Sequence, residues 1–268
     1  MPPEPVAPEP VSVVAPALPH PHLLRQRWRD VAFLHWAVRP AAVARFFPPG
    51  VEPDVLDGWT YVGLVPFRMT GTGFAHGPTL PWVGTFLETN VRLYSVDATG
   101  RRGVVFLSLD AERAVAVAAA RAAFGLPYRW ARMRFVADGD VRGYATRVRW
   151  PGVSARSRIV VRAGTQAPDG PLEQFLTARW GLHTAHLGRT WYLPNEHATW
   201  PLRTAEVLEL DDGLIAAAGL GDLAHRPPDH VAFSDGAYVR FGNPTPATTP
   251  RGSGKPLSGP LRAGKWLS

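Results

Sequence analysis

The sequence contains no cysteine among its 268 residues. This absence excludes disulfide bonds, thiolate metal sites and thiol nucleophiles. Charged residues interrupt every hydrophobic run before it reaches the roughly 18 residues that a membrane-spanning helix needs. The N-terminal segment has no basic start and no unbroken apolar stretch, so it does not resemble a secretion signal. We therefore expect a cytoplasmic protein without a membrane anchor.

Lysine is almost absent, since Lys255 and Lys265 are the only two and all other basic residues are arginines. The chain has 29 basic and 22 acidic residues, a net charge of +7. With 28 prolines, this bias is typical of a GC-rich genome. Its chemical consequence is that a lysine able to form an imine with a substrate would have to come from the end of the chain.

Several catalytic and cofactor motifs are also missing. The sequence has no Gly-x-Ser-x-Gly hydrolase elbow and no Gly-Lys-Ser/Thr phosphate loop. Gly71 and Gly73 lack the third glycine of a dinucleotide-binding fingerprint. His183 and His186 have a metal-like spacing, but no helical pattern or matching acid accompanies them. The sequence therefore predicts neither a metal site nor a cofactor.

Composition separates two tails from a central domain. Eight prolines among residues 1–22 predict an extended, disordered tail. Residues 243–268 are rich in Pro, Gly and Ser and basic, which predicts a second disordered tail. No internal repeat or linker interrupts residues 23–242, so they are expected to form one domain.

Turn residues and hydrophobic alternation predict mainly strands in that domain. Strands are expected at 28–38, 86–96, 103–109, 132–136, 141–150, 154–162, 184–193, 204–210 and 231–241, and helices at 39–47, 111–124 and 172–180. Asp110 is the expected N-cap of the longest helix and Gly125 its C-terminal stop. Asp57-Gly58 indicates a tight hairpin turn, and the glycine-rich stretch 69–84 a long loop. The pattern predicts an α+β fold with a mainly antiparallel sheet or barrel and two or three flanking helices.

One predicted strand carries the most informative polar residues. Phe86, Glu88, Asn90, Arg92 and Tyr94 alternate along it and therefore share one face. An acid, an amide and a guanidinium between two aromatic rings suit the wall of a polar pocket, and they equally suit a solvent-exposed outer face. Alternation alone does not determine which face is buried.

Other candidates are less defined. Tyr128 follows the turn after the longest helix and could belong to the core or to a site. His197 either packs in a turn or lines a cleft, where a neutral imidazole could serve as acid or base. A run of arginines offers either an anion-binding patch or a solvated surface: Arg129, Arg132, Arg134, Arg142, Arg147, Arg149, Arg156, Arg158 and Arg162.

Seven segments together resemble the bacterial, uncharacterised DUF2071 family. In chain order they are Phe33-Leu34-His35-Trp36, Asp57 to Phe67, Phe86 to Arg92, Phe106 to Asp110, Ala120-Arg121 through Tyr128, Leu172 to Thr177, and His197 to Leu202. One departure is Thr177-Ala178-Arg179-Trp180, where the family often has Thr-Glu-Arg-Tyr.

The resemblance implies a curved, cone-like β-barrel of the acetoacetate decarboxylase-like type, with a ligand pocket inside. It favours the pocket for the face that holds Glu88. In acetoacetate decarboxylases the imine-forming lysine follows a Gly-aromatic-Pro turn. That turn resembles Gly125-Leu126-Pro127, which places Tyr128 at the lysine position. Because tyrosine cannot form an imine, the resemblance does not carry that activity.

The leading hypothesis is a metal-free, lyase- or hydrolase-like acid–base enzyme acting on a small carboxylated or carbonyl ligand. The expected catalytic residues are Glu88, Tyr128 and His197. The expected ligand-binding residues are Asn90, Arg92, Tyr94, Arg121 and Trp200.

The first alternative is a non-catalytic small-molecule binding or sensor protein that uses the same pocket. The second, weaker alternative is a nucleic-acid or anionic-surface binder that uses the arginine run. The expected partner is thus a small organic acid or carbonyl compound, with nucleic acid disfavoured and a homo-oligomer possible.

Overall fold

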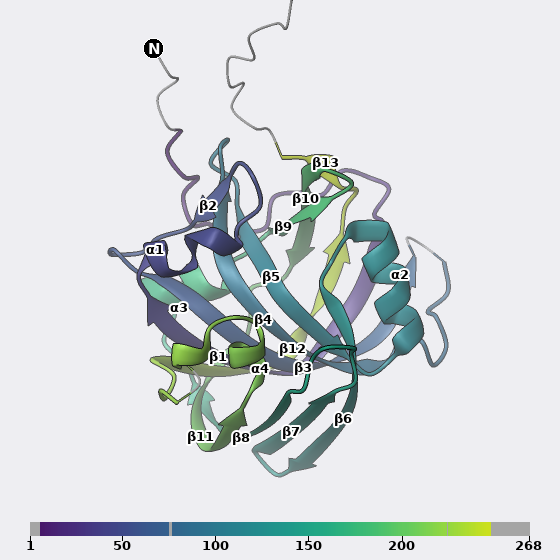
Figure 1. Cartoon of the computed structure of the whole chain (residues 1–268), viewed down its shortest axis with the longest axis vertical. Coiled ribbons are helices and arrows are strands. Elements are labelled where there is room, and N and C mark those ends of the chain that lie inside the picture. Colours follow the sequence, from purple (N-terminus) through teal and green to yellow (C-terminus); the bar gives the residue numbers. More distant parts are fainter. Residues whose placement is uncertain (1–5, 75–76, 224, 248–268) are drawn as a thin grey trace, which may run out of the picture.

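The structure is a computed structural model that describes residues 6–74, 77–223 and 225–247. Within them, thirteen strands form one sheet. The strands are β1 (Leu24–Val38), β2 (Val51–Pro53), β3 (Thr60–Phe74), β4 (Phe86–Asp97), β5 (Arg102–Ala111), β6 (Tyr128–Asp138), β7 (Val141–Val148), β8 (Arg156–Gln166), β9 (Gly181–His186), β10 (Arg189–His197), β11 (Leu202–Asp212), β12 (His230–Phe241) and β13 (Thr245–Pro246). The helices are α1 (Pro40–Val43), α2 (Ala114–Phe124), α3 (Pro171–Thr177) and α4 (Leu214–Ala217) (Figure 1). No helix of these ranges is long and apolar enough to cross a membrane.

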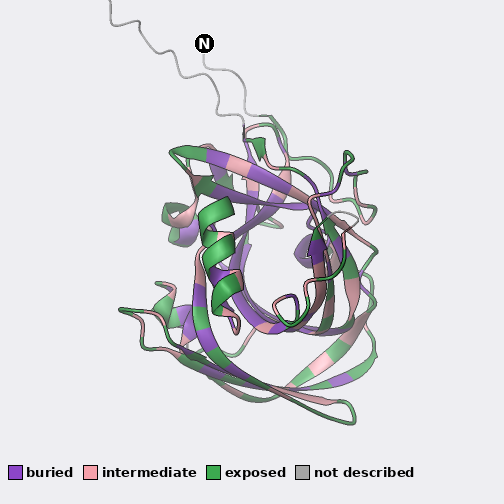
Figure 2. Ribbon diagram, turned by 90° about the vertical axis from the view of Figure 1, so that its right-hand side faces the viewer, coloured by how far each residue is buried: buried purple, intermediate pink, exposed green. Residues whose placement is uncertain are grey.

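The strand pairings run round a ring. The order is β13-β10-β9-β5-β6-β7-β8-β11-β12-β1-β3-β4-β2, and two extra pairings join β10 to β12 and β5 to β4. One ring therefore passes through β5, β9, β10, β12, β1, β3 and β4, and a second returns through β6, β7, β8 and β11 (Figure 2). Most pairings are antiparallel, but β5 is parallel to both β6 and β9. The expected strand-rich, barrel-like α+β fold is confirmed.

Strand β4 has buried residues on both faces because it belongs to both rings. Val91 and Leu93 join a core cluster with Ile159 of β8. Tyr94, on the opposite face, joins a second cluster with Phe175 of α3. The alternation predicted from the sequence is therefore present, but neither face of the strand meets solvent.

Some predicted elements need correction. Asp110 does not cap a helix. It lies fully buried in β5, one residue before the strand ends, and both of its carboxylate oxygens accept hydrogen bonds from Arg129 at 2.7 Å. Helix α2 begins later, at Ala114. The single strand expected at 184–193 is the hairpin of β9 and β10, because its chain reverses after His186. The long loop expected from residue 69 starts only after β3. The Asp57-Gly58 turn is present, with φ angles of 50° and 81°.

The predicted tails also differ where the structure describes them. The carbonyl oxygens of Ser12 and Val13 accept hydrogen bonds from Trp180 Nε1 at 2.8 Å and Thr199 Oγ1 at 3.2 Å. Leu18 is only 7% exposed. Residues 6–22 therefore lie against the barrel instead of forming a separate tail, because they find donors and apolar surface there. At the other end β13 still pairs with β10, and residues 248–268 lie outside the described part.

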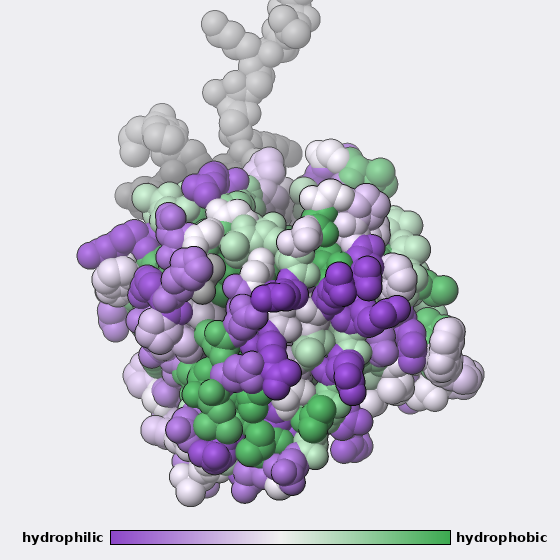
Figure 3. Space-filling view, turned by 60° about the horizontal axis from the view of Figure 1, so that its bottom comes forward, coloured by the Kyte–Doolittle hydropathy of each residue, from purple (hydrophilic) through white to green (hydrophobic). Residues whose placement is uncertain are grey.

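The predicted arginine run does not form one free basic surface. Arg156, Arg158 and Arg162 face carboxylates of β11 at 3.4, 2.7 and 2.8 Å, and Arg142 pairs with Asp30. Figure 3 shows one face of the molecule, where a group of hydrophobic side chains lies beside hydrophilic ones.

Candidate functional site

The inner face of β4 forms one wall of a cavity of about 120 Å³. Glu88, Asn90 and Arg92 line it and are 2%, 3% and 8% exposed. Tyr128 reaches the same cavity from the start of β6, and His197 and Trp200 reach it from the end of β10 and the following turn. The alternative of a solvated outer face for Glu88 is therefore wrong. We call this space the inner cavity.

The carboxyl group of Glu88 is held in a protonated state near neutral pH. The hydroxyl of Tyr128 donates a hydrogen bond to Glu88 Oε2 at 2.9 Å. Burial raises the pKa of Glu88 to about 8, although hydrogen bonds from Tyr128 and Asn90 oppose the shift. Burial, and then the nearby Glu88, raise the pKa of Tyr128 well above its usual value. The pair therefore offers a buried proton at the wall of the inner cavity.

Arg92 is the unpaired charge of the inner cavity. Its Nη2 donates to Tyr94 Oη at 3.1 Å and to the carbonyl oxygen of Leu176 at 3.2 Å. Among the described residues no carboxylate lies within 4.0 Å of its guanidinium, and its Nε has no hydrogen-bond partner. A buried charge without a counterion is costly, so the guanidinium is well suited to an anionic ligand.

A series of buried, hydrogen-bonded polar side chains supports Arg92 on the side away from the inner cavity. Tyr94 Oη lies 2.7 Å from His35 Nε2, and His35 Nδ1 lies 3.0 Å from His230 Nδ1. His230 Nε2 is in turn 3.8 Å from Glu173 on α3. Burial, with repulsion from His230 and Arg92, holds the pKa of His35 well below its usual value. His35 is therefore neutral, and it orients the tyrosine that supports Arg92.

Four lining residues carry a buried polar atom without a hydrogen-bond partner among the described residues: Asn90 Oδ1, Arg92 Nε, Arg179 Nη2 and Asn195 Oδ1. Each such atom costs on the order of 1–3 kcal/mol when it stays unsatisfied in the interior. Unpaired acceptors and unpaired donors are therefore both present among the residues that line the inner cavity.

Arg179 and Asn195 are site residues that the sequence interpretation missed. Arg179 Nε donates to the Phe175 carbonyl oxygen at 2.6 Å, and its Nη1 pairs with Asp54. Arg179 lies in the segment Thr177–Trp180, which departs from the family pattern. The departure concerns the neighbouring position, where the family glutamate is replaced, and it gives no sign of a role for Arg179. Asn195 has no local signal, because only the pairing of β10 with β9 and β12 brings it to the inner cavity.

Two predicted ligand-binding residues do not line the inner cavity. Tyr94 is fully buried behind Arg92, as the hydrogen bonds above show. Arg121 is exposed on α2, where its guanidinium lies over the ring of Trp150 at 4.6 Å and donates to the Tyr128 carbonyl oxygen at 2.8 Å. Arg121 therefore holds the backbone of a lining residue from outside.

His197 lies in a cluster of aromatic rings beside the inner cavity, tilted against its two neighbours. Its ring centroid is 4.6 Å from Trp180 and 4.9 Å from Trp200. Burial lowers the pKa of His197 to about 4, although a hydrogen bond with the Ala198 carbonyl oxygen opposes this. The imidazole is therefore neutral at pH 7.

His183 and His186, whose spacing resembles that of metal ligands, do not face a common point. His183 is buried against Ser95 and Asp97, whereas His186 lies three residues further along β9, on the opposite face. Within residues 6–74, 77–223 and 225–247, no group of three or more metal-ligating side chains comes together.

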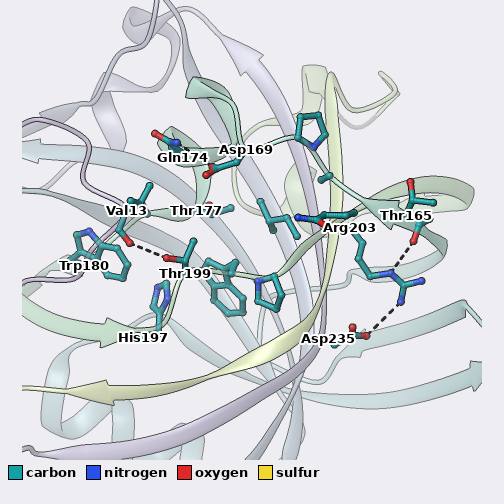
Figure 4. Close-up of a pocket in the computed structure, with 18 residues that line it drawn as sticks. Val13, Thr165, Asp169, Gln174, Thr177, Trp180, His197, Thr199, Arg203 and Asp235 are labelled. Atoms are coloured by element: carbon teal, nitrogen blue, oxygen red, sulfur yellow. Dashed lines mark hydrogen bonds and ion pairs between the residues drawn. The ribbon is translucent and has the colours of Figure 1, made fainter.

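A second, larger space adjoins the inner cavity (Figure 4). It has a volume of about 560 Å³ and opens more widely to solvent, and we call it the outer cleft. Thr177, His197 and Trp200 line both spaces. The two spaces therefore meet at these three side chains.

The solved structures to which this fold is similar include acetoacetate decarboxylases and other enzymes. The acetoacetate decarboxylase of Legionella pneumophila matches with a TM-score of 0.63 and 12% identity over 87% of this chain and 92% of that one. The acetoacetate decarboxylase-like enzyme of Sphingomonas wittichii RW1 gives 0.58 and 13% over 84% and 92%. The enduracididine biosynthesis enzyme MppR, in complex with pyruvate, gives 0.57 and 16% over 87% and 93%. The fold is therefore of the acetoacetate decarboxylase-like class.

Sequence comparison identifies the family within that class. The model of DUF2071, described as an uncharacterised conserved protein, matches residues 25–238. The uncharacterised protein YqjF of Bacillus subtilis (strain 168) is 32% identical over 186 residues, which are 69% of this chain and 76% of that protein. The chain belongs to the DUF2071 family, as its seven matching segments predicted.

Proposed function

We propose that the inner cavity binds a small organic acid, with Arg92 holding the carboxylate. The observation that carries this proposal is the buried guanidinium without a carboxylate partner among the described residues. A guanidinium gives a carboxylate two parallel, charge-assisted hydrogen bonds, and the hydrogen bonds of Arg92 to other described residues come from Nη2 alone. The pyruvate complex of MppR supports the substrate class, because pyruvate is a small carboxylate with a neighbouring carbonyl group.

The proposed chemistry is acid–base catalysis on such a ligand. With a pKa of about 8, Glu88 is mostly protonated at pH 7 and can give its proton to a carbonyl or enolate oxygen. Tyr128 would orient that carboxyl group, and neutral His197 would accept or return a proton at the outer side of the inner cavity.

The proposed route does not include an imine. Amine catalysis needs a lysine with a lowered pKa at the site. The described residues contain no lysine, since Lys255 and Lys265 both lie beyond them. Tyr128 occupies the cavity position at which the family resemblance expects the lysine of a decarboxylase.

Calorimetric titration with pyruvate and with acetoacetate tests the proposal. We expect Arg92→Ala to weaken pyruvate binding at least tenfold. The matched control is Arg158→Ala, which removes an exposed arginine of β8 outside the inner cavity and should leave the affinity within twofold. Circular dichroism establishes that both variants fold, and Arg92→Gln serves as a second, more conservative variant.

Equal pyruvate affinity in the wild type and both Arg92 variants would contradict the proposal. Long incubation of the bound acid, followed by NMR of the small molecule, separates the enzyme from the sensor alternative. A changed ligand whose turnover is lost in Glu88→Gln supports catalysis, and an unchanged one supports a binding protein.

A further inference from the structure

The inner cavity is too small to hold more than the reacting end of a substantial ligand. Its volume of about 120 Å³ contrasts with about 560 Å³ in the outer cleft. A ligand that continues beyond its acid group must therefore pass Thr177, His197 and Trp200. The outer cleft begins on the other side of these same three side chains.

The outer cleft differs from the inner cavity in its charges. Arg203, its only lining cation among the described residues, already pairs with Asp140 at 2.7 Å and with Asp235 at 3.7 Å. Gln174 donates to Asp169 at 3.1 Å across the upper part of the outer cleft (Figure 4). Asp169, which is exposed, has no cation within 4.0 Å among the described residues, so two carboxylates and one cation line the outer cleft. This excess of negative charge disfavours a second anionic group on the ligand, whereas an uncharged group meets no such repulsion.

Aromatic rings form one wall of the outer cleft. Trp180, His197 and Trp200 all line it, and His197 lies between the two indoles. Flat apolar ring faces next to hydroxyl and amide groups bind rings by stacking while polar edges are hydrogen-bonded. Thr165 and Gln166 supply such groups on the opposite side.

The N-terminal segment fixes this wall in place. Val13 lines the outer cleft, and its carbonyl oxygen accepts the hydrogen bond from Thr199 (Figure 4). The neighbouring carbonyl of Ser12 accepts the indole N–H of Trp180. Trp180 and Thr199, the residue before Trp200, are thus both hydrogen-bonded to the same short N-terminal segment.

We propose that the outer cleft binds a neutral ring attached to the acid that Arg92 holds. The ligand class is then a 2-oxo or related acid that carries an uncharged ring, with its acid group in the inner cavity. This inference rests on the proposed function, because it needs an acid anchored on Arg92. It adds that the ring, and not the acid group, supplies most of the specificity.

The test compares pyruvate with phenylpyruvate by calorimetric titration of the full chain. We expect phenylpyruvate to bind at least tenfold more tightly. Gln174→Trp fills the outer cleft and should remove that advantage while leaving the pyruvate affinity within twofold. Gln166→Trp fills the cleft from the opposite side if the first variant does not fold. Val136→Trp, on an exposed position of β6, is the matched control and should change neither affinity.

The outcomes separate the two proposals. If pyruvate binds in an Arg92-dependent way and phenylpyruvate binds no more tightly, the outer-cleft proposal is wrong and the proposed function stands. The same conclusion follows if both filling variants keep the full advantage of phenylpyruvate. If neither acid binds, or neither depends on Arg92, both proposals are wrong.

Discussion

Arg92 and Arg129 are equally buried, each with 8% of its surface exposed, yet they have different surroundings. Arg129 forms a two-pronged ion pair with Asp110 between β5 and β6. Within the described part of the chain, Arg92 donates hydrogen bonds only to a tyrosine hydroxyl and a carbonyl oxygen, and it contacts the rings of Phe33 and Tyr94. Burial therefore does not distinguish the ion-paired Arg129 from Arg92, which we propose binds the carboxylate of a ligand. The presence or absence of a built-in carboxylate does.

The largest expected effect on the free energy of unfolding comes from removing Asp110, the partner of Arg129. Asp110→Ala leaves Arg129 buried without a counterion and should destabilise the protein by about 3–5 kcal/mol. Arg92→Ala breaks two buried hydrogen bonds but no ion pair among the described residues, and it also removes a buried charge that has no counterion. These effects offset each other in part, so the loss should be smaller, about 1–2 kcal/mol. Urea denaturation measures both changes. Similar losses in the two variants would show that Arg92 is also a structural charge.

Glu88 extends the comparison to a buried acid without a cation beside it. Its folded-state pKa of about 8 exceeds the unfolded value of about 4.5, so the folded state binds the proton more tightly. Stability from this group is therefore complete below pH 4.5 and is lost as the pH rises toward 8 and above. The loss between pH 5 and pH 8 should be roughly 3 kcal/mol. Urea denaturation should show that the free energy of unfolding falls by that amount in the wild type between pH 5 and pH 8. In Glu88→Gln this part of the fall should be absent. An unchanged slope would place a charged carboxylate at Glu88.

The sequence predicts the polar face of β4 but not its environment. Alternation places Glu88, Asn90 and Arg92 together because side chains in a strand repeat every two residues. The ring closure that buries this face depends on β9, β10 and β12, which follow about a hundred residues later. For that reason no local pattern could find Asn195, and the resemblance to a barrel family supplied the missing information.

Asp110 shows the opposite case, in which a valid local rule gives the wrong element. An aspartate before an alanine-rich helix is a good N-cap. In the structure the chain stays in β5 through Ala111, because the Asp110 carboxylate has a stronger partner in Arg129. Arg129 comes from the strand after the helix, so the pairing is tertiary and not visible in the local sequence.

Removing the Tyr94 hydroxyl that contacts Arg92 should have a moderate effect on ligand affinity. Tyr94→Phe removes the hydroxyl that accepts from Arg92 and lies 2.7 Å from His35. We expect pyruvate affinity to fall about three- to tenfold, because the guanidinium loses one of its two positioning contacts. Tyr61→Phe is the control, since that ring packs on Tyr94 and has no hydrogen bond to Arg92. Calorimetric titration that finds equal affinities would remove Tyr94 from the positioning groups.

The smallest effect belongs to the exposed arginines of β8. Arg156, Arg158 and Arg162 pair with acids of β11, and more than half of each side chain is exposed. Exposed ion pairs contribute little to stability, so changing all three to alanine should leave the urea midpoint within error. Because carboxylates already neutralise these arginines, retention on heparin should also change little between 50 and 200 mM salt. A large loss of retention in the triple variant would instead support an anionic-surface partner on this face. It would also show that exposure, and not the lack of a carboxylate, marks the arginines that bind anions.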